Sequence, residues 1–585
     1  MDLERKYFKR SLVYPKNLII DGFSFLRYFG RALKLRLYKR CKPAHTWTKA
    51  RPAWLPDCSN QNLDVEPENT NHKHYIKYEG SLCGDGLYSS FGKKGWPDND
   101  PEKYWCFHRW GWLSSAFLEG SVSGPEAVNW IEKWIKNNKD YNDPSWEPFS
   151  CSERIANIFF LRENMSDKER DNILSGPIKS FIIKSANWII QHLEYYGPVD
   201  TNNHILNNAR ALFIAAGLTK NYQFSKVAFS IFENMLPVLI SKEGFLRERS
   251  SHYQVLVLRW ILDVKRMIAL DKDILKNNNH IDFILYYVNI LSKATAYICD
   301  SKGMLKVLIG DVSPDSEPKS LCNSLKAFYP EWNKRSCIEN SGSKDESWFF
   351  LKEGRLEVIT NQPHEYPVKY SNHGHADISS FAFLFDGQQV LVDPGRNNYT
   401  KEPLSRDFIS GFFHNVPLVD GIPPVPAPFF KRWIPASYGS VRVKSNLTDK
   451  DCITVEHDGF NRTGSKILHV RSIFVDKRRL KVIDEFKGSG LHQITLCWHF
   501  APGFDRDGNF KEGKDIYLSS SFCKVRINTI CEDMILNNSK VSFYKASDKG
   551  GWYSPCYGTI KPALSVRIQD DLNLPVVMST TFYIS

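Results

Sequence analysis

The sequence predicts an α+β protein of several domains, in which a helical region is followed by an antiparallel β region. Three observations lead to this prediction. The chain has 585 residues, more than a single hydrophobic core usually supports. Apolar residues recur at helical spacing between residues 101 and 300. After the polar stretch Asn340–Glu346, the period of the apolar pattern falls to about two residues, as in strands.

Residues 1–100 are expected to form a partly helical N-terminal extension. The first residues are basic and lack an apolar core followed by a cleavage site, so no conventional secretion signal is predicted. No run of about 18 apolar residues occurs, and therefore no membrane span is expected. The basic amphipathic stretch Phe23–Arg40 could lie on an acidic membrane surface, although docking on the neighbouring domain is favoured. We expect a cytoplasmic protein, with membrane association left open.

Between residues 101 and 335, apolar residues at helical spacing predict a series of helices joined by short polar breaks. The segments with this pattern are AVNWIEKWIKN, FIIKSANWIIQHLEYY, KVAFSIFENMLPVLI, YQVLVLRWILDVKRMIAL and IDFILYYVNIL. Short connections favour antiparallel helical hairpins. Periodicity alone leaves a bundle, a solenoid and a toroid open.

The remaining chain, residues 336–585, is expected to form an antiparallel β domain. In FAFLFDGQQVLVD, Phe381, Phe383 and Phe385 share one face, and Asp386-Gly387 form the turn of a hairpin. The alternating pattern continues through KILHVRSIFVDKRRLKVIDEF, HQITLCWHF, CKVRIN and ALSVRIQ. Two stacked sheets are the expected arrangement.

Composition narrows the class of partner. A net charge of +12 suits a negatively charged partner, which could be nucleic acid, a membrane surface or an acidic glycan. No nucleic-acid motif accompanies this charge, so nucleic acid is not expected. The 16 Trp and 26 Tyr residues suit stacking on sugar rings, although most should belong to cores. The 13 Cys residues include no CxxC pair, and reduced, buried thiols are therefore expected.

The first cluster of polar residues with chemical potential is Asn202-Asn203-His204, ahead of the apolar segment ILNNARALFIAAG. This position places Asn203 and His204 in the first turn of a helix, where free N–H groups and the helix dipole favour an anion. A plain helix cap by either asparagine explains the same residues without any function.

The second cluster is RERSSHY, which runs from Arg247 to Tyr253 ahead of another apolar helix. Ser250 or Ser251 would serve as an N-cap, which accounts for the serines. It does not account for His252 and Tyr253. A tyrosine near positive charge can acquire a pKa low enough for proton exchange with a sugar.

The third cluster contains His373-Gly374-His375, then Asp393 in a DPG motif, and later His414. Gly374 favours a bend, so His373 and His375 should diverge and serve different purposes. His375, Asp393 and His414 form a plausible set of zinc ligands from separate segments. Unrelated surface histidines in β loops are the alternative.

Together these segments resemble the heparinase II/III family of polysaccharide lyases, which includes alginate-type relatives. The resemblance covers residues 100–585 and rests on NNHILNNARALFIAAG, LRERSSHYQ, NHGHADISSFAFLFDGQQVLVDPG, FFHNVPLVDG and GWYSPCYG. It implies an incomplete (α/α) toroid at residues 101–335 and an antiparallel β-sandwich at residues 336–585, with the active site between them. It also implies cleavage of an acidic, uronate-containing polysaccharide by β-elimination.

The resemblance further implies roles for individual residues. The catalytic residues it implies are Asn203 and His204, which would contact the substrate carboxylate, and Tyr253 and His373, which would transfer protons. The residues expected to bind substrate are Arg249, Arg396 and Tyr399. The implied cofactor is a structural zinc ion held by His375, Asp393 and His414.

Two other classes of function remain open at this point. One is a different sugar-active enzyme on the same scaffold, acting in surface-polysaccharide metabolism. The other is a non-catalytic glycan-binding protein. An unsaturated product that absorbs ultraviolet light would favour the lyase over both.

Overall fold

The computed structural model describes Pro56 and residues 100–174, 176–197, 201–333, 347–362, 373–400, 402–425, 441–446, 452–463, 466–507, 515–531, 534–535 and 539–585. The expectations for residues 1–99, including the amphipathic stretch Phe23–Arg40, lie outside this part of the chain apart from Pro56. Among the described helices, none has the length and apolar character needed to span a bilayer. All nine described cysteines are free thiols.

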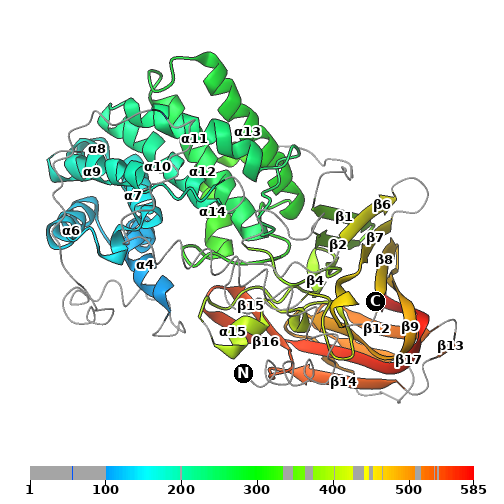
Figure 1. Cartoon of the computed structure of the whole chain (residues 1–585). Coiled ribbons are helices and arrows are strands. Elements are labelled where there is room, and N and C mark those ends of the chain that lie inside the picture. Colours follow the sequence, from blue (N-terminus) through cyan, green and yellow to red (C-terminus); the bar gives the residue numbers. More distant parts are fainter. Residues whose placement is uncertain are drawn as a thin grey trace. The chain divides into compact units, whose positions relative to one another are not determined.

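Helices follow one another from Pro101 to Asn333, as the apolar spacing predicts (Figure 1). They are α4 (Pro101–Arg109), α5 (Gly111–Leu118), α6 (Gly124–Asn137), η3 (Pro144–Trp146), α7 (Pro148–Asn164), α8 (Asp167–Asn172), α9 (Pro177–Gln191), α10 (His204–Thr219), α11 (Gln223–Leu239), α12 (Ser251–Leu270), α13 (Asn278–Ile298), α14 (Pro318–Phe328) and η4 (Pro330–Asn333). Each of the five predicted helical segments overlaps one of these helices, which are α6, α9, α11, α12 and α13.

Strands follow from Trp348 to Ile584, with short helices between some of them. The strands are β1 (Trp348–Glu353), β2 (Leu356–Asn361), β3 (Ala382–Phe385), β4 (Gln388–Leu391), β5 (Pro417–Val419), β6 (Val441–Asn446), β7 (Cys452–His457), β8 (Leu468–Asp476), β9 (Arg479–Phe500), β10 (Asp505–Arg506), β11 (Ile516–Ser519), β12 (Lys524–Cys531), β13 (Met534–Ile535), β14 (Lys540–Lys545), β15 (Trp552–Cys556), β16 (Thr559–Pro562) and β17 (Leu564–Ile584). The intervening helices are α15 (Pro403–Asp407), η5 (Gly411–Phe413) and η6 (Gly459–Thr463).

Strands β9 and β17 pair with each other along most of their length and organise the β region. The first half of β9 pairs with β8, and its second half pairs with β5 and β4. The register between β9 and β17 shifts between Leu574 and Val576. The two long strands therefore join most of the described strands into one hydrogen-bonded sheet of 15 strands, where two stacked sheets were expected, and its core includes Phe383, Trp498 and Phe582.

The predicted hairpin is present as β3 and β4, joined by Asp386 and Gly387. Both turn residues have positive φ values, 50° and 75°, which matches the right-handed twist of paired strands. Phe383 and Phe385 lie in the core of the β region, as their alternation predicts. Residues 373–381, ahead of β3, form no strand, so the expected bend around Gly374 is confirmed.

The described chain divides into two compact units whose limits differ from the change of secondary structure. One unit contains Leu239–Arg259 together with Val288–Ser585, and the other contains the helical chain up to Val238 together with Trp260–Tyr287. Helix gives way to strand between Asn333 and Trp348, around the boundary predicted at residues 335 and 336. The first turns of α12 thus belong to the same compact unit as the strands.

Candidate active site and metal-binding cluster

Tyr253 lies in the first turn of α12, and Ser250 caps this helix. The Ser250 hydroxyl accepts a hydrogen bond from the Tyr253 amide at 3.1 Å and donates one to the Asp311 carbonyl at 2.7 Å. A Cβ atom added at Gly310 would lie 2.4 Å from the Arg249 carbonyl oxygen, so only glycine fits this close approach. The cap predicted at Ser250 or Ser251 is Ser250, and it ties the helix to the Asp311 segment.

The Tyr253 ring stacks on the His373 imidazole, with ring centroids 3.6 Å apart and planes at 11°. The phenol oxygen of Tyr253 lies 3.3 Å from that of Tyr399. His373 Nε2 is 3.2 Å from Glu248 Oε2, and His373 Nδ1 is 3.2 Å from Asp311 Oδ2. The imidazole is therefore oriented from both sides by buried carboxylates while its face supports Tyr253.

Arg249, predicted to contact substrate, has a different set of partners in the structure. Its side chain is 2% exposed, and its guanidinium donates to Asp377 Oδ1 at 2.6 Å and to Asn361 Oδ1 at 2.7 Å. Its backbone has a φ of 60°, an uncommon value outside glycine. Since the planar guanidinium is committed to these acceptors, we leave Arg249 out of the substrate contacts and assign it to holding the helix start against β2 and the His373 segment.

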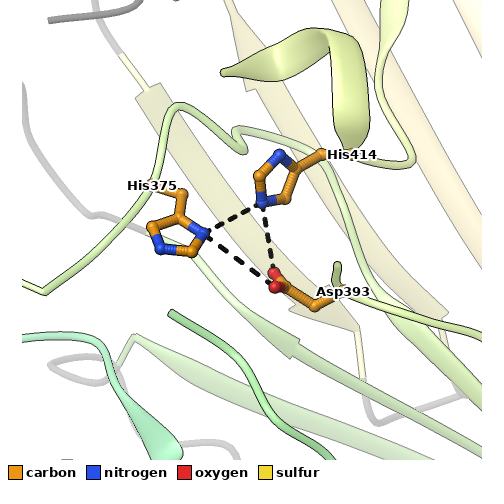
Figure 2. Close-up of side chains that lie close together, drawn as sticks. All are labelled: His375, Asp393 and His414. Carbon is orange, nitrogen blue, oxygen red and sulfur yellow. Dashed lines mark hydrogen bonds and ion pairs between the residues drawn. The ribbon is translucent and has the colours of Figure 1, made fainter. Parts of the chain in front are cut away.

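His375, Asp393 and His414 bring their donor atoms to one place, as the sequence predicts (Figure 2). The three atoms lie within 4.8 Å of one another and all three residues are buried. His375 Nδ1 is 3.1 Å from His414 Nε2, which in turn is 3.4 Å from Asp393 Oδ2. His373 contacts none of these three donor atoms in the described contacts and serves the Tyr253 side instead.

The hydrogen bonds around this cluster fit a bound cation. His414 Nδ1 lies 2.7 Å from the Ser410 carbonyl, which only an N–H can satisfy, so Nε2 of the neutral ring carries a lone pair. His375 Nε2 faces the Asp311 carboxylate at 3.2 Å, which in the same way leaves a lone pair on Nδ1. Two lone pairs and the Asp393 carboxylate thus face a common point. A nitrogen and oxygen set of this kind suits a transition metal such as zinc.

The charge balance at this cluster points the same way. Burial alone would lower the pKa of His414, but the Asp393 carboxylate, the charge of Asp377 and the hydrogen bond to Ser410 together raise it. The surroundings therefore favour positive charge between these side chains.

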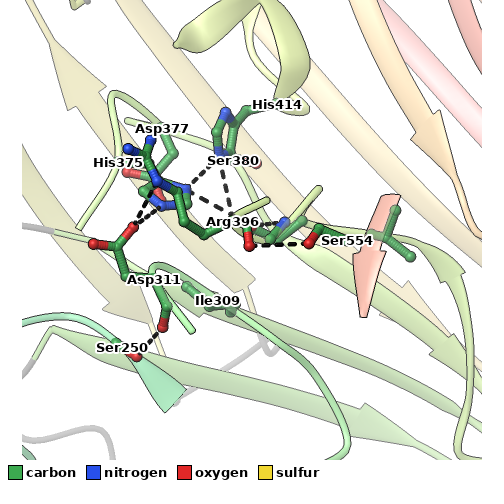
Figure 3. A network of polar contacts seen from close by, with 12 residues as sticks. Ser250, Ile309, Asp311, His375, Asp377, Ser380, Arg396, His414 and Ser554 are labelled. Carbon is green, nitrogen blue, oxygen red and sulfur yellow. Dashed lines mark hydrogen bonds and ion pairs between the residues drawn. The ribbon is translucent and has the colours of Figure 1, made fainter. Parts of the chain in front are cut away.

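Asp311 is a central residue that the sequence analysis did not single out. Its carboxylate is 3.2 Å from His375, and Arg396 Nε lies 3.6 Å from Oδ1 (Figure 3). The other carboxylate oxygen is 3.2 Å from His373. Burial alone would raise the pKa of Asp311, but the hydrogen bonds from both histidines and the charge of Arg396 lower it. No motif marks this aspartate, because its importance comes from a fold that brings residues 311 and 373 together. Glu248 was missed for the same reason.

Arg396 and Tyr399 lie next to the Tyr253–His373 pair and are both buried. Arg396 donates to the Ser405 carbonyl at 3.0 Å, and its guanidinium carbon lies 5.4 Å from the centre of the Tyr399 ring. The Tyr399 amide donates to the Tyr557 hydroxyl at 2.7 Å, which links this loop to the GWYSPCYG segment. Tyr399 is therefore placed to act with Tyr253.

Asn203 and His204 belong to the other compact unit and occupy the start of α10, as predicted. Asn202 caps the helix by accepting from the His204 amide at 3.1 Å, and the Asn203 side chain makes no capping bond. His204 Nδ1 lies 2.7 Å from Glu194 Oε1, and the His204 side chain is 33% exposed. Burial alone would lower the pKa of His204, but the Glu194 carboxylate raises it. A simple cap therefore accounts for Asn202 and leaves Asn203 and His204 to be explained.

Comparison with known proteins supports the resemblance seen in the sequence. Residues 344–577 match the family model described as heparinase II/III-like, C-terminal. A search of curated proteins gave no match to this chain.

Several solved structures share the fold. A heparinase III structure has a TM-score of 0.61 at 16% identity, with 84% of this chain and 79% of that chain covered. A heparinase III described as the BT4657 gene product has a TM-score of 0.59 at 15% identity, with 87% and 82% covered. A mutant of the heparan sulfate lyase HepC from Pedobacter heparinus has a TM-score of 0.56 at 14% identity, with 84% and 78% covered. The chain thus carries a heparinase II/III-like C-terminal domain and has the fold of the heparinase III structures.

Proposed function

We propose that this protein is a polysaccharide lyase that cleaves an acidic, uronate-containing polysaccharide by β-elimination. The observation that carries the proposal is the stack of Tyr253 on His373, with ring centroids 3.6 Å apart, in a chain with the heparinase III fold. His373 lies two residues before His375, which belongs to the metal-binding cluster of His375, Asp393 and His414. The similar structures include a heparinase III and a heparan sulfate lyase, which adds support for an acidic polysaccharide as substrate.

β-Elimination removes the weakly acidic proton next to the uronate carboxyl group while the glycosidic oxygen departs. Tyr253 and His373 divide the two proton transfers in this proposal, because their rings are in contact and Tyr253 carries an exchangeable proton. Tyr399 lies 3.3 Å from the Tyr253 oxygen and would help to orient that hydroxyl group. The stereochemistry of the cleaved sugar decides which group acts as base and which as acid.

The carboxylate of the substrate must be neutralised before its neighbouring carbon can lose a proton. We assign this task to Asn203 and His204, as the resemblance implies. The charge environment of His204 supports the assignment, since Glu194 raises its pKa and favours the cationic ring. The Asn203 side chain is buried at the helix start, where the dipole favours an anion.

His375, Asp393 and His414 would hold zinc in this proposal, since their donor atoms converge. Zinc bound there would supply a fixed positive charge that keeps the three loops together. His375 and His373 are close in sequence, so the loop that carries the metal ligand also carries the proposed catalytic histidine.

The experiment that tests the proposal incubates purified protein with a panel of uronate polysaccharides and follows absorbance of unsaturated uronate products. We expect absorbance to rise with wild-type protein and to stay flat with Tyr253→Phe. Cleavage without an absorbing product would indicate a sugar-active enzyme of another kind instead of a lyase. Binding without cleavage would favour a glycan-binding protein. The cytoplasmic location stays a prediction.

A further inference from the structure

Asp311 contacts both the metal-binding cluster and the Tyr253–His373 pair through its side chain. Its Oδ1 atom is 3.2 Å from Nε2 of His375, the nitrogen that points away from the metal-binding cluster. Its Oδ2 atom is 3.2 Å from Nδ1 of His373. One rigid carboxylate thus spans two histidines that the sequence separates by a single glycine.

The backbone of Asp311 adds two further connections to the same pair. Its amide donates to the His373 carbonyl at 2.8 Å, and its carbonyl accepts from the Ser250 hydroxyl at 2.7 Å. Ser250 caps the helix that carries Tyr253. The neighbouring Ile309 carbonyl accepts from the Ser251 amide at 3.0 Å, so the whole segment is paired with the helix start.

The residues around Asp311 leave its side chain little room to adopt another position. The residue is 4% exposed, and Gly310 before it has a φ of 77° with no room for a Cβ atom. Arg396 Nε, 3.6 Å from Oδ1, balances its charge. The position of the carboxylate is therefore fixed by the fold before any ligand binds.

We infer that Asp311 is a positioning residue that couples the metal-binding cluster to the Tyr253–His373 pair. Its effect on catalysis rests on the proposed function, whereas its effect on metal binding does not. A carboxylate that accepts from the second nitrogen of a metal-bound histidine fixes that ring, and losing such a partner typically costs about 10- to 100-fold in metal affinity. At Asp311 the same carboxylate also fixes the catalytic ring, so a disturbance at one site reaches the other.

The first test measures zinc affinity by competition with a chromophoric chelator for wild-type protein and Asp311→Asn. Asparagine keeps the shape of the side chain and removes one acceptor oxygen. We expect zinc binding to weaken by about 10- to 100-fold. We also expect turnover of Asp311→Asn to stay well below wild type when zinc is saturating, because His373 remains poorly positioned.

The matched control is Asp263→Asn. Asp263 is a buried aspartate 2.6 Å from Arg210, in the other compact unit and without contact to the metal-binding cluster in the described contacts. This variant should lose stability and keep wild-type zinc affinity, which separates a general folding defect from coupling.

Wild-type zinc affinity in Asp311→Asn would overturn the link to the metal. Full recovery of turnover with saturating zinc would overturn the link to His373. If wild-type protein cleaves no polysaccharide, the proposed function fails, while the zinc affinities still decide the metal link.

A second measurement uses only wild-type protein and therefore does not depend on the folding of a variant. Zinc added to the metal-free protein should shift the imidazole NMR resonances of His373 as well as those of His375 and His414. The resonances of His469, whose ring bonds to Asp484 and His457 and to none of the three proposed ligands in the described contacts, should move much less. His373 resonances that do not respond to zinc would contradict the coupling.

Discussion

The β region contains two buried groups of histidines and carboxylates with opposite designs. In the metal-binding cluster, donor atoms of His375, Asp393 and His414 face a common point. The second group consists of His457, His469 and Asp484, whose hydrogen bonds form a chain. The Gly459 amide lies 3.4 Å from His457 Nδ1, and His457 Nε2 lies 2.9 Å from His469 Nδ1. His469 Nε2 in turn lies 2.8 Å from Asp484. Each nitrogen of that chain has one protein partner.

The comparison teaches that residue type alone does not distinguish a functional site from a structural one. Arg471 neutralises Asp484 at 2.7 Å and donates to the carbonyls of Ser379 and Asn415, so the chain is complete without a ligand. The metal-binding cluster brings donor atoms together, an arrangement that a bound cation would stabilise. Changes to the first group should therefore alter chemistry, and changes to the second should alter stability.

The largest expected effect comes from Tyr253, beside the metal-binding cluster. Tyr253→Phe keeps the stacked ring and removes the exchangeable proton, so turnover should fall by about a hundredfold or more while thermal stability is retained. Initial rates of unsaturated product formation measure this. Tyr222→Phe, which removes a hydroxyl bonded to Asp271 on the helical side, is the control. Equal rates for wild type and Tyr253→Phe would remove Tyr253 from the mechanism.

The next effect concerns metal content in matched histidine variants. His375→Ala removes a proposed ligand and should abolish stoichiometric zinc, whereas His469→Ala should retain zinc and lose stability. Elemental analysis and thermal melts of both variants provide the measurement. Zinc-free wild-type protein with full activity would defeat the zinc assignment. Loss of zinc from His469→Ala alone would reverse the comparison.

A smaller effect separates buried from exposed ion pairs. Asp484→Asn leaves the buried Arg471 charge without its partner and should destabilise the β region by about 3–5 kcal/mol. Asp386→Asn removes a partner of Arg355 at the surface, where solvent screens the ion pair, so the loss of stability should be much smaller. Denaturant melts of the two variants test this. Equal losses would mean that Arg471 finds other acceptors.

The smallest expected effect is a change in the pH dependence of stability. Burial, His469 and Arg471 hold the pKa of His457 well below 6.5, so the folded state binds the proton less readily than the unfolded state. Stability from this residue is present above pH 6.5 and is lost as pH falls below that value, by up to about 1.4 kcal/mol per pH unit. His457→Gln should flatten the slope between pH 6.5 and 5. An unchanged slope would show that other groups govern acid lability.

The sequence predicted the secondary-structure elements well because they depend on local patterns. The convergence of His375, Asp393 and His414 was implied by the resemblance, since these residues lie in separate segments. Apolar spacing predicted the five helical segments, and Asp386-Gly387 predicted the hairpin. These elements are encoded within a few residues of where they form. His375 lies beside His414 and His373 stacks on Tyr253, while both imidazoles also contact Asp311. That the two histidines serve different purposes stays a prediction.

The misses have a physical cause as well. Asp311 and Glu248 acquire their importance only when the loop after α13, the start of α12 and the segment at residue 373 meet in the fold. The substrate contact expected of Arg249 stays a prediction, and the structure shows the side chain paired within the protein. Its partners, Asp377 and Asn361, come from distant segments that the sequence alone does not bring together.

One consequence follows for the way such proteins can be divided and recombined. The match to the family model begins at residue 344. Tyr253 and Asp311 come from the sequence before it, in segments that belong to the same compact unit as the strands. An exchange between relatives at the boundary of the family model would separate Tyr253 from His373 and Asp311 from His375. The compact unit that holds Tyr253, His373 and the proposed metal ligands is therefore discontinuous in sequence. Chimaeras should be designed to transfer residues 239–259 and 288–585 together.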